Sequence, residues 1–96
     1  MTVRWLRKAL RSLDAEATCV AADDPAAARL VVERVLQSVA VLEDQPGIGR
    51  AGRVSGTREL VVSKTRHVVP YPVRGELVEI LRVFHSSRRP PRQEPV

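Results

Sequence analysis

The segment Arg58–Phe84 reads RELVVSKTRHVVPYPVRGELVEILRVF and consists of three apolar runs separated by two short breaks. Both breaks, Lys64-Thr65 and Arg74-Gly75, have the two-residue length that tight β-hairpins require. Pro70 and Pro72 cannot donate to a hydrogen-bond ladder, so they indicate a bulge or a poorly paired margin in the middle run. The segment therefore predicts three consecutive antiparallel strands, at Arg58–Ser63, Arg66–Val73 and Glu76–Phe84.

Two amphipathic helices are predicted before this sheet. The first begins at Leu6 and shows apolar residues at spacings of three and four up to Val20. The second starts at Asp24-Pro25, because an Asp oxygen can cap free N–H groups and proline suits the first helical position. Its apolar stripe consists of Ala28, Val32, Val35, Val39 and Leu42, and it ends before Gln45. The short join between the helices predicts an antiparallel hairpin.

The predicted fold is an α+β domain in the order β-α-α-β-β-β, with Thr2–Trp5 as a short N-terminal strand. The helix hairpin packs on one face of a small antiparallel sheet. A chain of 96 residues is long enough for one domain. We assign that domain to residues 1–87, and we expect residues 88–96 to form a basic, proline-rich and flexible tail.

The loop Gln45–Gly56 holds four of the five glycines and contains a GxGxxG match at Gly47–Gly52. A dinucleotide-binding motif needs a strand before it and a helix after it, so that phosphate meets a helix N-terminus. Here a helix precedes the motif and a strand follows it. We therefore interpret the loop as a flexible connector.

Composition restricts the function classes. Aromatic residues make up only 3% of the chain, which excludes an aromatic platform for stacking single-stranded bases. The single cysteine, Cys19, cannot form an internal disulfide and indicates a reducing compartment. No apolar run is long enough to span a membrane, no cofactor is implied, and no His/Cys or carboxylate spacing suggests a metal. We expect a cytoplasmic protein.

Positive charge is concentrated in the second half of the chain. Residues 47–96 hold ten Lys/Arg against four Asp/Glu, a net +6, whereas residues 1–46 hold six against seven, a net −1. A basic surface can bind nucleic acid, a ribosome or an acidic protein. The strands are also apolar on both faces, although one helix hairpin covers only one of them. This indicates a protein partner or a dimer on the second face, or helices shared between both faces.

With the two-residue turns, Arg58 faces Tyr71 and His67 faces Arg82 across neighbouring strands, which gathers all four on one face. Such a set could form a metal-free ribonuclease, with arginines stabilising a phosphorane and His67 or Tyr71 transferring protons. The alternative is structural: both arginines are rim cations that pair with Glu76, Glu79 or a partner, and the histidine is an ordinary strand residue.

Three motifs in this order carry a family resemblance: P-G-x-G-R at Pro46–Arg50, G-T-R-E-L at Gly56–Leu60, and V-E-I-L-R-V-x-H at Val78–His85. Together they resemble the ParE branch of the ParE/RelE toxin superfamily, from Trp5 to about Arg89. The resemblance implies a helical hairpin on a small sheet. It also implies a growth-inhibiting toxin that forms a hetero-oligomer with a cognate antitoxin encoded nearby.

ParE-like members poison DNA gyrase, whereas RelE-like members cut messenger RNA in the ribosome. The RelE-like pattern is incomplete here, since Leu60 replaces an expected cation, His67 stands where a stronger base is expected, and no tyrosine follows Tyr71. The resemblance therefore implies a gyrase inhibitor. A ribosome-dependent nuclease, or a decayed toxin that only binds its antitoxin, are the alternatives. The ParE pattern also has an arginine near Pro72 and an aromatic residue in the tail, and this chain has neither.

Contact residues follow from this resemblance. The expected target contacts are Arg82, His85, Arg88 and Arg89, at the end of the last strand and in the tail. The expected antitoxin contacts are Arg58, Leu60, Val62, Val69, Ile80 and Phe84, on the sheet.

Overall fold

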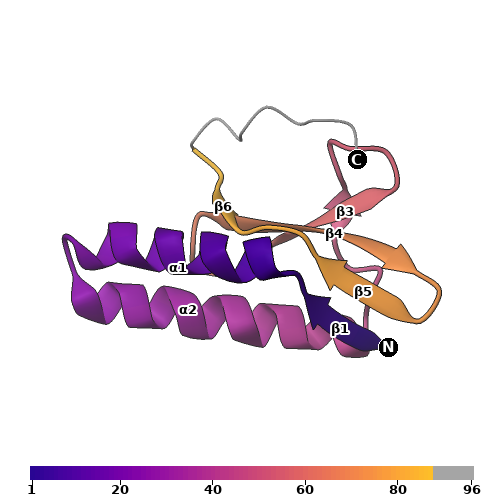
Figure 1. The fold of residues 1–96 in the computed structure, drawn as a ribbon, viewed down its shortest axis with the longest axis horizontal. Coiled ribbons are helices and arrows are strands. Elements are labelled where there is room, and N and C mark those ends of the chain that lie inside the picture. The colour runs from indigo at the N-terminus through magenta and orange to yellow at the C-terminus, as the bar shows by residue number, and fades with distance from the viewer. Residues whose placement is uncertain (88–96) are drawn as a thin grey trace.

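The computed structural model of the protein describes residues 1–87, and it has two helices packed against a mixed β-sheet (Figure 1). The predicted α+β class is confirmed. In chain order the elements are β1 (Thr2–Trp5), α1 (Arg7–Ala21), α2 (Pro25–Ala40), a 3₁₀ turn η1 (Val41–Glu43), β2 (Arg50–Ala51), β3 (Thr57–Val61), β4 (His67–Arg74), β5 (Leu77–Ile80) and β6 (Phe84–His85).

The helix hairpin forms as the sequence predicts. The Asp24 carboxylate accepts hydrogen bonds from the backbone N–H groups of Ala26 and Ala27, both 3.1 Å, and Pro25 opens α2. The two helices lie side by side on one side of the sheet (Figure 1). This arrangement excludes the alternative in which the helices are shared between both faces. The buried positions of the hairpin are Ala9, Leu13, Ala28, Val35, Val39 and, in the 3₁₀ turn, Leu42.

The sheet has the strand order β1-β5-β4-β3-β2, and β6 pairs with β4 beyond the end of β5. The four pairings among β2 to β6 are antiparallel. β1 instead lies parallel to β5, with Thr2 opposite Leu77 and Trp5 opposite Ile80. The sheet is therefore mixed, where the sequence predicted a purely antiparallel one.

The register of the first hairpin is confirmed. Arg58 lies opposite Tyr71, and the Val62 N–H donates to the His67 carbonyl at 3.0 Å. Lys64, in the predicted turn, has a φ of 59°. The connection is longer than the predicted two residues, because the Thr65 N–H donates to the Val62 carbonyl at 3.3 Å and Lys64 is the third residue of that turn. A residue with a side chain adopts this left-handed conformation only at some cost.

The register of the second hairpin differs from the prediction by two residues. Arg74 pairs with Leu77 and Val73 pairs with Val78, so the turn is Gly75-Glu76 and not Arg74-Gly75. Gly75 has a φ of +60° and stands at the first central position. A glycine adopts this conformation without a steric penalty, which places the turn one residue later than expected.

The two prolines of β4 interrupt its pairing with the following strand. The Leu81 N–H donates to the Pro70 carbonyl at 3.1 Å, so the even-numbered residues of β4 direct their polar groups toward β5. Pro70 and Pro72 have no N–H to donate on that side. β5 therefore ends at Ile80, and the chain pairs with β4 again at β6, where Phe84 lies opposite Val68 and His85 opposite His67. Between the two pairings, the β5–β6 side carries one residue more than β4.

The core lies between the helices and one face of the sheet. From the strands it contains Leu60, Val69, Tyr71, Val78 and Ile80, and Val62 after β3 and Val83 after β5 complete it. On the opposite face, Val68 and Phe84 are buried, while Val61 is exposed. The Arg53 guanidinium lies 5.5 Å from the centre of the Phe84 ring. Part of the second face is thus covered by the chain's own Gly52–Gly56 segment.

Candidate functional site: a braced loop at the end of the sheet

Tyr71 holds the loop between η1 and β3 against the end of the sheet. Its hydroxyl donates to the Pro46 carbonyl at 2.8 Å and accepts from the Gly49 N–H at 2.9 Å. The side chain is 0% exposed. Because donor and acceptor capacity are both used, a buried phenol is fully satisfied at this site.

Gly49 lies directly against this tyrosine. A Cβ atom at this position would come within 2.5 Å of the Tyr71 hydroxyl and 3.0 Å of the Glu59 carbonyl. Only a residue without a side chain fits this gap. The expectation of a flexible connector is therefore wrong, since the loop is packed and hydrogen-bonded along its first half.

Arg58 and Glu59, neighbours on β3, hold the loop from two sides. Arg58 Nη1 donates to the carbonyls of Gly47 and Gly49, at 3.3 and 2.9 Å. The buried Glu59 carboxylate accepts from the Arg53 N–H at 3.1 Å and from the Arg50 guanidinium at 3.2 Å. Arg53 Nε lies 3.8 Å from the same carboxylate. A buried carboxylate is tolerated here because cations and a backbone donor surround it.

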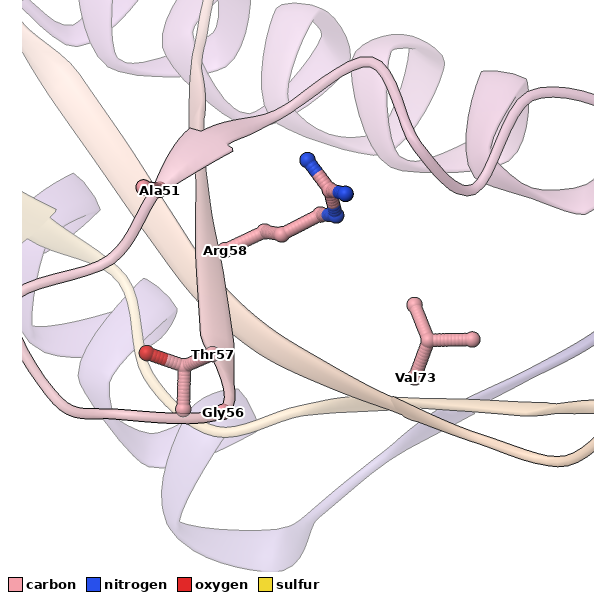
Figure 2. Close-up of a pocket in the computed structure, with 5 residues that line it drawn as sticks. All are labelled: Ala51, Gly56, Thr57, Arg58 and Val73. Carbon is pink, nitrogen blue, oxygen red and sulfur yellow. The ribbon is translucent and has the colours of Figure 1, made fainter.

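A shallow depression of about 410 Å³ lies beside the loop, lined by Ala51, Gly56, Thr57, Arg58 and Val73. Figure 2 shows the Arg58 side chain from β3 and the Val73 side chain from β4 on the same side of the strands. The lining combines exposed apolar groups with one cation. Such a surface suits a protein segment that carries an acidic side chain next to an apolar one.

His67 lies on the same face of β4 as Tyr71, but against helix α1. Its Nε2 atom is 3.1 Å from Glu16 Oε1, and the side chain is 3% exposed. Its Nδ1 atom is buried and has no hydrogen-bond partner. The ring packs edge-on against His85, with centroids 5.2 Å apart. The histidine therefore joins the sheet to the helix hairpin and is closed to solvent.

The four residues of the hypothetical nuclease set are not gathered as predicted. Arg58 and Tyr71 do lie opposite each other. The two-residue shift of the second hairpin and the further register step after Ile80 together place His85, and not Arg82, opposite His67. Both proton-transfer candidates, His67 and Tyr71, are buried and engaged with other parts of the chain. Arg74, and not Arg58 or Arg82, pairs with Glu79, at 3.5 Å.

Neither a metal centre nor a membrane span is found within residues 1–87. No group of three His, Cys, Asp or Glu side chains in this part of the chain could hold a metal ion. None of its helices combines the length and the apolar character that crossing a bilayer requires.

Comparisons with known proteins agree with this architecture. A family model described as the ParE toxin of the type II toxin–antitoxin system parDE matches residues 3–90. The chain belongs to this ParE toxin family. It is 40% identical over 89 residues to a Sinorhizobium fredii protein described as "Putative toxin Y4kP", covering 93% of this chain and 92% of that one. A solved structure of the chromosomal ParDE system from P. aeruginosa is similar with a TM-score of 0.78 and 31% identity, over 88% of this chain and 95% of that one.

The structure places most of the expected antitoxin contacts in the core of this ParE-family domain. Leu60, Val62, Val69 and Ile80 are buried between the sheet and the helices. They cannot form a contact surface without unfolding, because the strand face that we assigned to the partner is the face that the helices cover. Phe84 is buried on the other face beside Arg53, and of the six only Arg58 is exposed.

Of the four expected target contacts, the structure describes only Arg82 and His85. Arg82 and His85 are half-buried, and His85 Nδ1 lies 2.7 Å from the Ser87 hydroxyl. Arg88 and Arg89 lie outside the described residues. The site residues that sequence reasoning missed are Glu59 and Gly49. Glu59 could have been noticed as an acidic residue within an apolar strand run, because the preceding loop carries Arg50 and Arg53.

Proposed function

We propose that this ParE-family toxin inhibits growth by binding DNA gyrase in the cytoplasm, and that a cognate antitoxin binds and neutralises it. The observation that carries the proposal is the burial of His67 and Tyr71. A nuclease of the RelE type would need one of these groups at the reacting phosphate. The enclosure of both rings supports a toxin that acts by binding a protein over a nuclease that uses His67 or Tyr71.

The antitoxin partner follows from family membership and from charge. The basic second half of the chain suits a segment rich in Asp and Glu. The depression beside Arg58 suits the acidic and apolar side chains of such a segment. A hetero-oligomer of toxin and antitoxin is the state that this surface favours.

The test is a supercoiling assay with purified gyrase, relaxed plasmid, ATP and increasing amounts of the purified chain. We expect loss of supercoiled product or accumulation of cleaved DNA. Adding the purified product of the adjacent reading frame should restore supercoiling. Unchanged supercoiling at a molar excess of folded chain would refute gyrase as the target, and new cuts in translated messages would instead favour the ribosome-dependent nuclease.

A further inference from the structure

Cations from two elements meet at the connection between β3 and β4. Arg34 of α2 donates from Nη1 to the Lys64 carbonyl at 3.3 Å, which places its guanidinium beside this connection. Lys64 and Arg66 belong to the connection itself, and both are exposed. The Ser86 N–H, just after β6, donates to the Arg66 carbonyl at 2.6 Å. Three parts of the chain that are distant in sequence therefore meet at one end of the sheet.

The loop segments of this surface carry only hydroxyl and cationic side chains. Residues 63–66 read SKTR, and residues 86–87 read SS. We call these two segments, together with Arg34, the basic end of the sheet. Glu16, the carboxylate that reaches this end of β4 from α1, lies 3.1 Å from His67 and is 13% exposed. The basic end therefore presents positive charge to solvent without an apolar residue in either segment.

The backbone of the basic end is held in place by hydrogen bonds. The Thr65 hydroxyl donates to the Val62 carbonyl at 3.0 Å and accepts from the His67 N–H at 3.0 Å. The bonds from Arg34 and Ser86 fix the carbonyls of Lys64 and Arg66. A surface that is ordered in advance loses less entropy when it binds a partner.

The opposite end of β4 has a different chemistry. The depression there combines the Arg58 guanidinium with the apolar side chains of Ala51 and Val73. Protein partners need such apolar groups, because the buried centre of a protein interface is apolar. Lys, Arg, Ser and Thr side chains without apolar neighbours are instead the groups that contact phosphates in protein–DNA complexes. The basic end therefore suits a phosphate backbone better than the acidic and apolar segment expected of an antitoxin.

The aromatic residues decide between single-stranded and double-stranded nucleic acid. Proteins that bind single strands stack bases on exposed aromatic rings. All three aromatic residues of this chain lie within the described residues, where Tyr71 and Phe84 are buried and Trp5 is half-buried. A duplex keeps its bases stacked within itself and offers its phosphates. The surface therefore matches a duplex.

We propose that the basic end binds the phosphate backbone of double-stranded DNA, with Arg34, Lys64 and Arg66 each contacting a phosphate. The choice of DNA over RNA rests on the proposed function, because gyrase holds DNA in the complex that the toxin joins. Phosphate contacts carry no sequence information, so binding is independent of the DNA sequence.

The test measures binding of the full chain to a fluorescently labelled DNA duplex, without gyrase, at several salt concentrations. Each phosphate contact releases counterions, so the logarithm of the affinity falls linearly with the logarithm of the salt concentration. Lys64→Gln and Arg66→Gln should each weaken binding about tenfold at low salt and reduce the slope by about one. Lys64→Arg keeps the charge and should bind within about twofold of the wild type.

Arg74→Gln is the matched control. It removes the same charge from the opposite end of β4, where Arg74 is 65% exposed, and it should leave the slope unchanged. If Arg74→Gln weakens binding as much as the other two glutamine variants, net charge explains the binding and the inference is overturned. Thermal unfolding of each variant checks that the fold is intact, and Arg66→Gln tests the same surface if Lys64→Gln is unstable.

Further arms separate this inference from the other partners and from the proposed function. A duplex of RNA that binds while the DNA duplex does not would overturn the inference. The same holds if the glutamine variants keep their affinity for DNA but lose the purified product of the adjacent reading frame. If the wild-type chain does not bind the DNA duplex, the inference fails, and the supercoiling assay with gyrase still decides the proposed function.

Discussion

Tyr71 and His67 are two buried polar rings on one face of β4, and their hydrogen bonding differs. Tyr71 uses its hydroxyl as donor and acceptor toward a loop that is distant in sequence. His67 uses one ring nitrogen toward Glu16, while the other is buried without a partner. Both were candidates for proton transfer, yet both are enclosed by the fold.

The two rings should therefore contribute differently to the stability of the fold. A buried polar group whose bonds are all made adds to stability and fixes one arrangement of its surroundings. A buried polar atom without a partner subtracts from stability. Tyr71 should therefore be hard to replace, and His67 should be replaceable by an apolar residue of similar size. Three substitutions test this contrast.

The largest effect is expected for Gly49→Ala. The added methyl group would meet the Tyr71 hydroxyl and the Glu59 carbonyl, so the loop must move and lose its bonds, at a cost of about 3 kcal/mol. Gly47→Ala is the matched control, because nothing lies within 4 Å of its Cβ position and its φ is not left-handed. Urea unfolding followed by fluorescence of the single tryptophan, Trp5, measures both. Equal stabilities of the two variants would contradict the tight packing of the loop.

A smaller loss is expected for Tyr71→Phe. This change keeps the buried ring but leaves the Pro46 carbonyl and the Gly49 N–H without their partner, which costs about 2 kcal/mol. The same variant should reduce the penalty of Gly49→Ala, since the atom nearest to the new methyl group is removed. A double-mutant cycle in urea measures this coupling, and additive penalties would contradict it.

The smallest effect is expected for His67→Leu. The substitution removes the bond to Glu16 but also removes the unpartnered Nδ1 atom, and these terms nearly cancel. The change in unfolding free energy should stay below about 1 kcal/mol. If His67→Leu lowers the unfolding free energy by more than Tyr71→Phe does, the pair of His67 with Glu16 stabilises the fold strongly, and this would contradict the prediction.

The helices and the first hairpin could be predicted because local rules decide them. An aspartate before a proline starts α2, and the spacing of apolar residues selects the buried stripe. The predicted register of the second hairpin is wrong by two residues, and its turn by one, because Arg74-Gly75 fits the spacing of a two-residue turn as well as Gly75-Glu76 does. Gly75 takes the first central position of the turn, where its φ of +60° carries no steric penalty. Because Pro70 and Pro72 interrupt the pairing of β4 with β5, the apolar pattern of these strands does not define the register.

The site could be predicted only where it depends on the first hairpin. The pairing of Arg58 with Tyr71 follows from the turn at Lys64-Thr65 and is confirmed. The partners of these side chains are carbonyl groups of Pro46 and the glycines, which no sequence pattern identifies. The two apolar faces of the strands also look alike in sequence, so the core face was assigned to the antitoxin.

We infer that His67 and Tyr71 support the fold of this toxin and take no part in catalysis. The most direct measurement expresses the wild type and His67→Leu without the neighbouring gene, and assays plasmid supercoiling and message cleavage in the same cultures. If gyrase is the target, as we propose, both proteins should give relaxed or cleaved DNA and intact messages. Cut messages with normal supercoiling, lost in His67→Leu, would contradict it and make the histidine part of an active site.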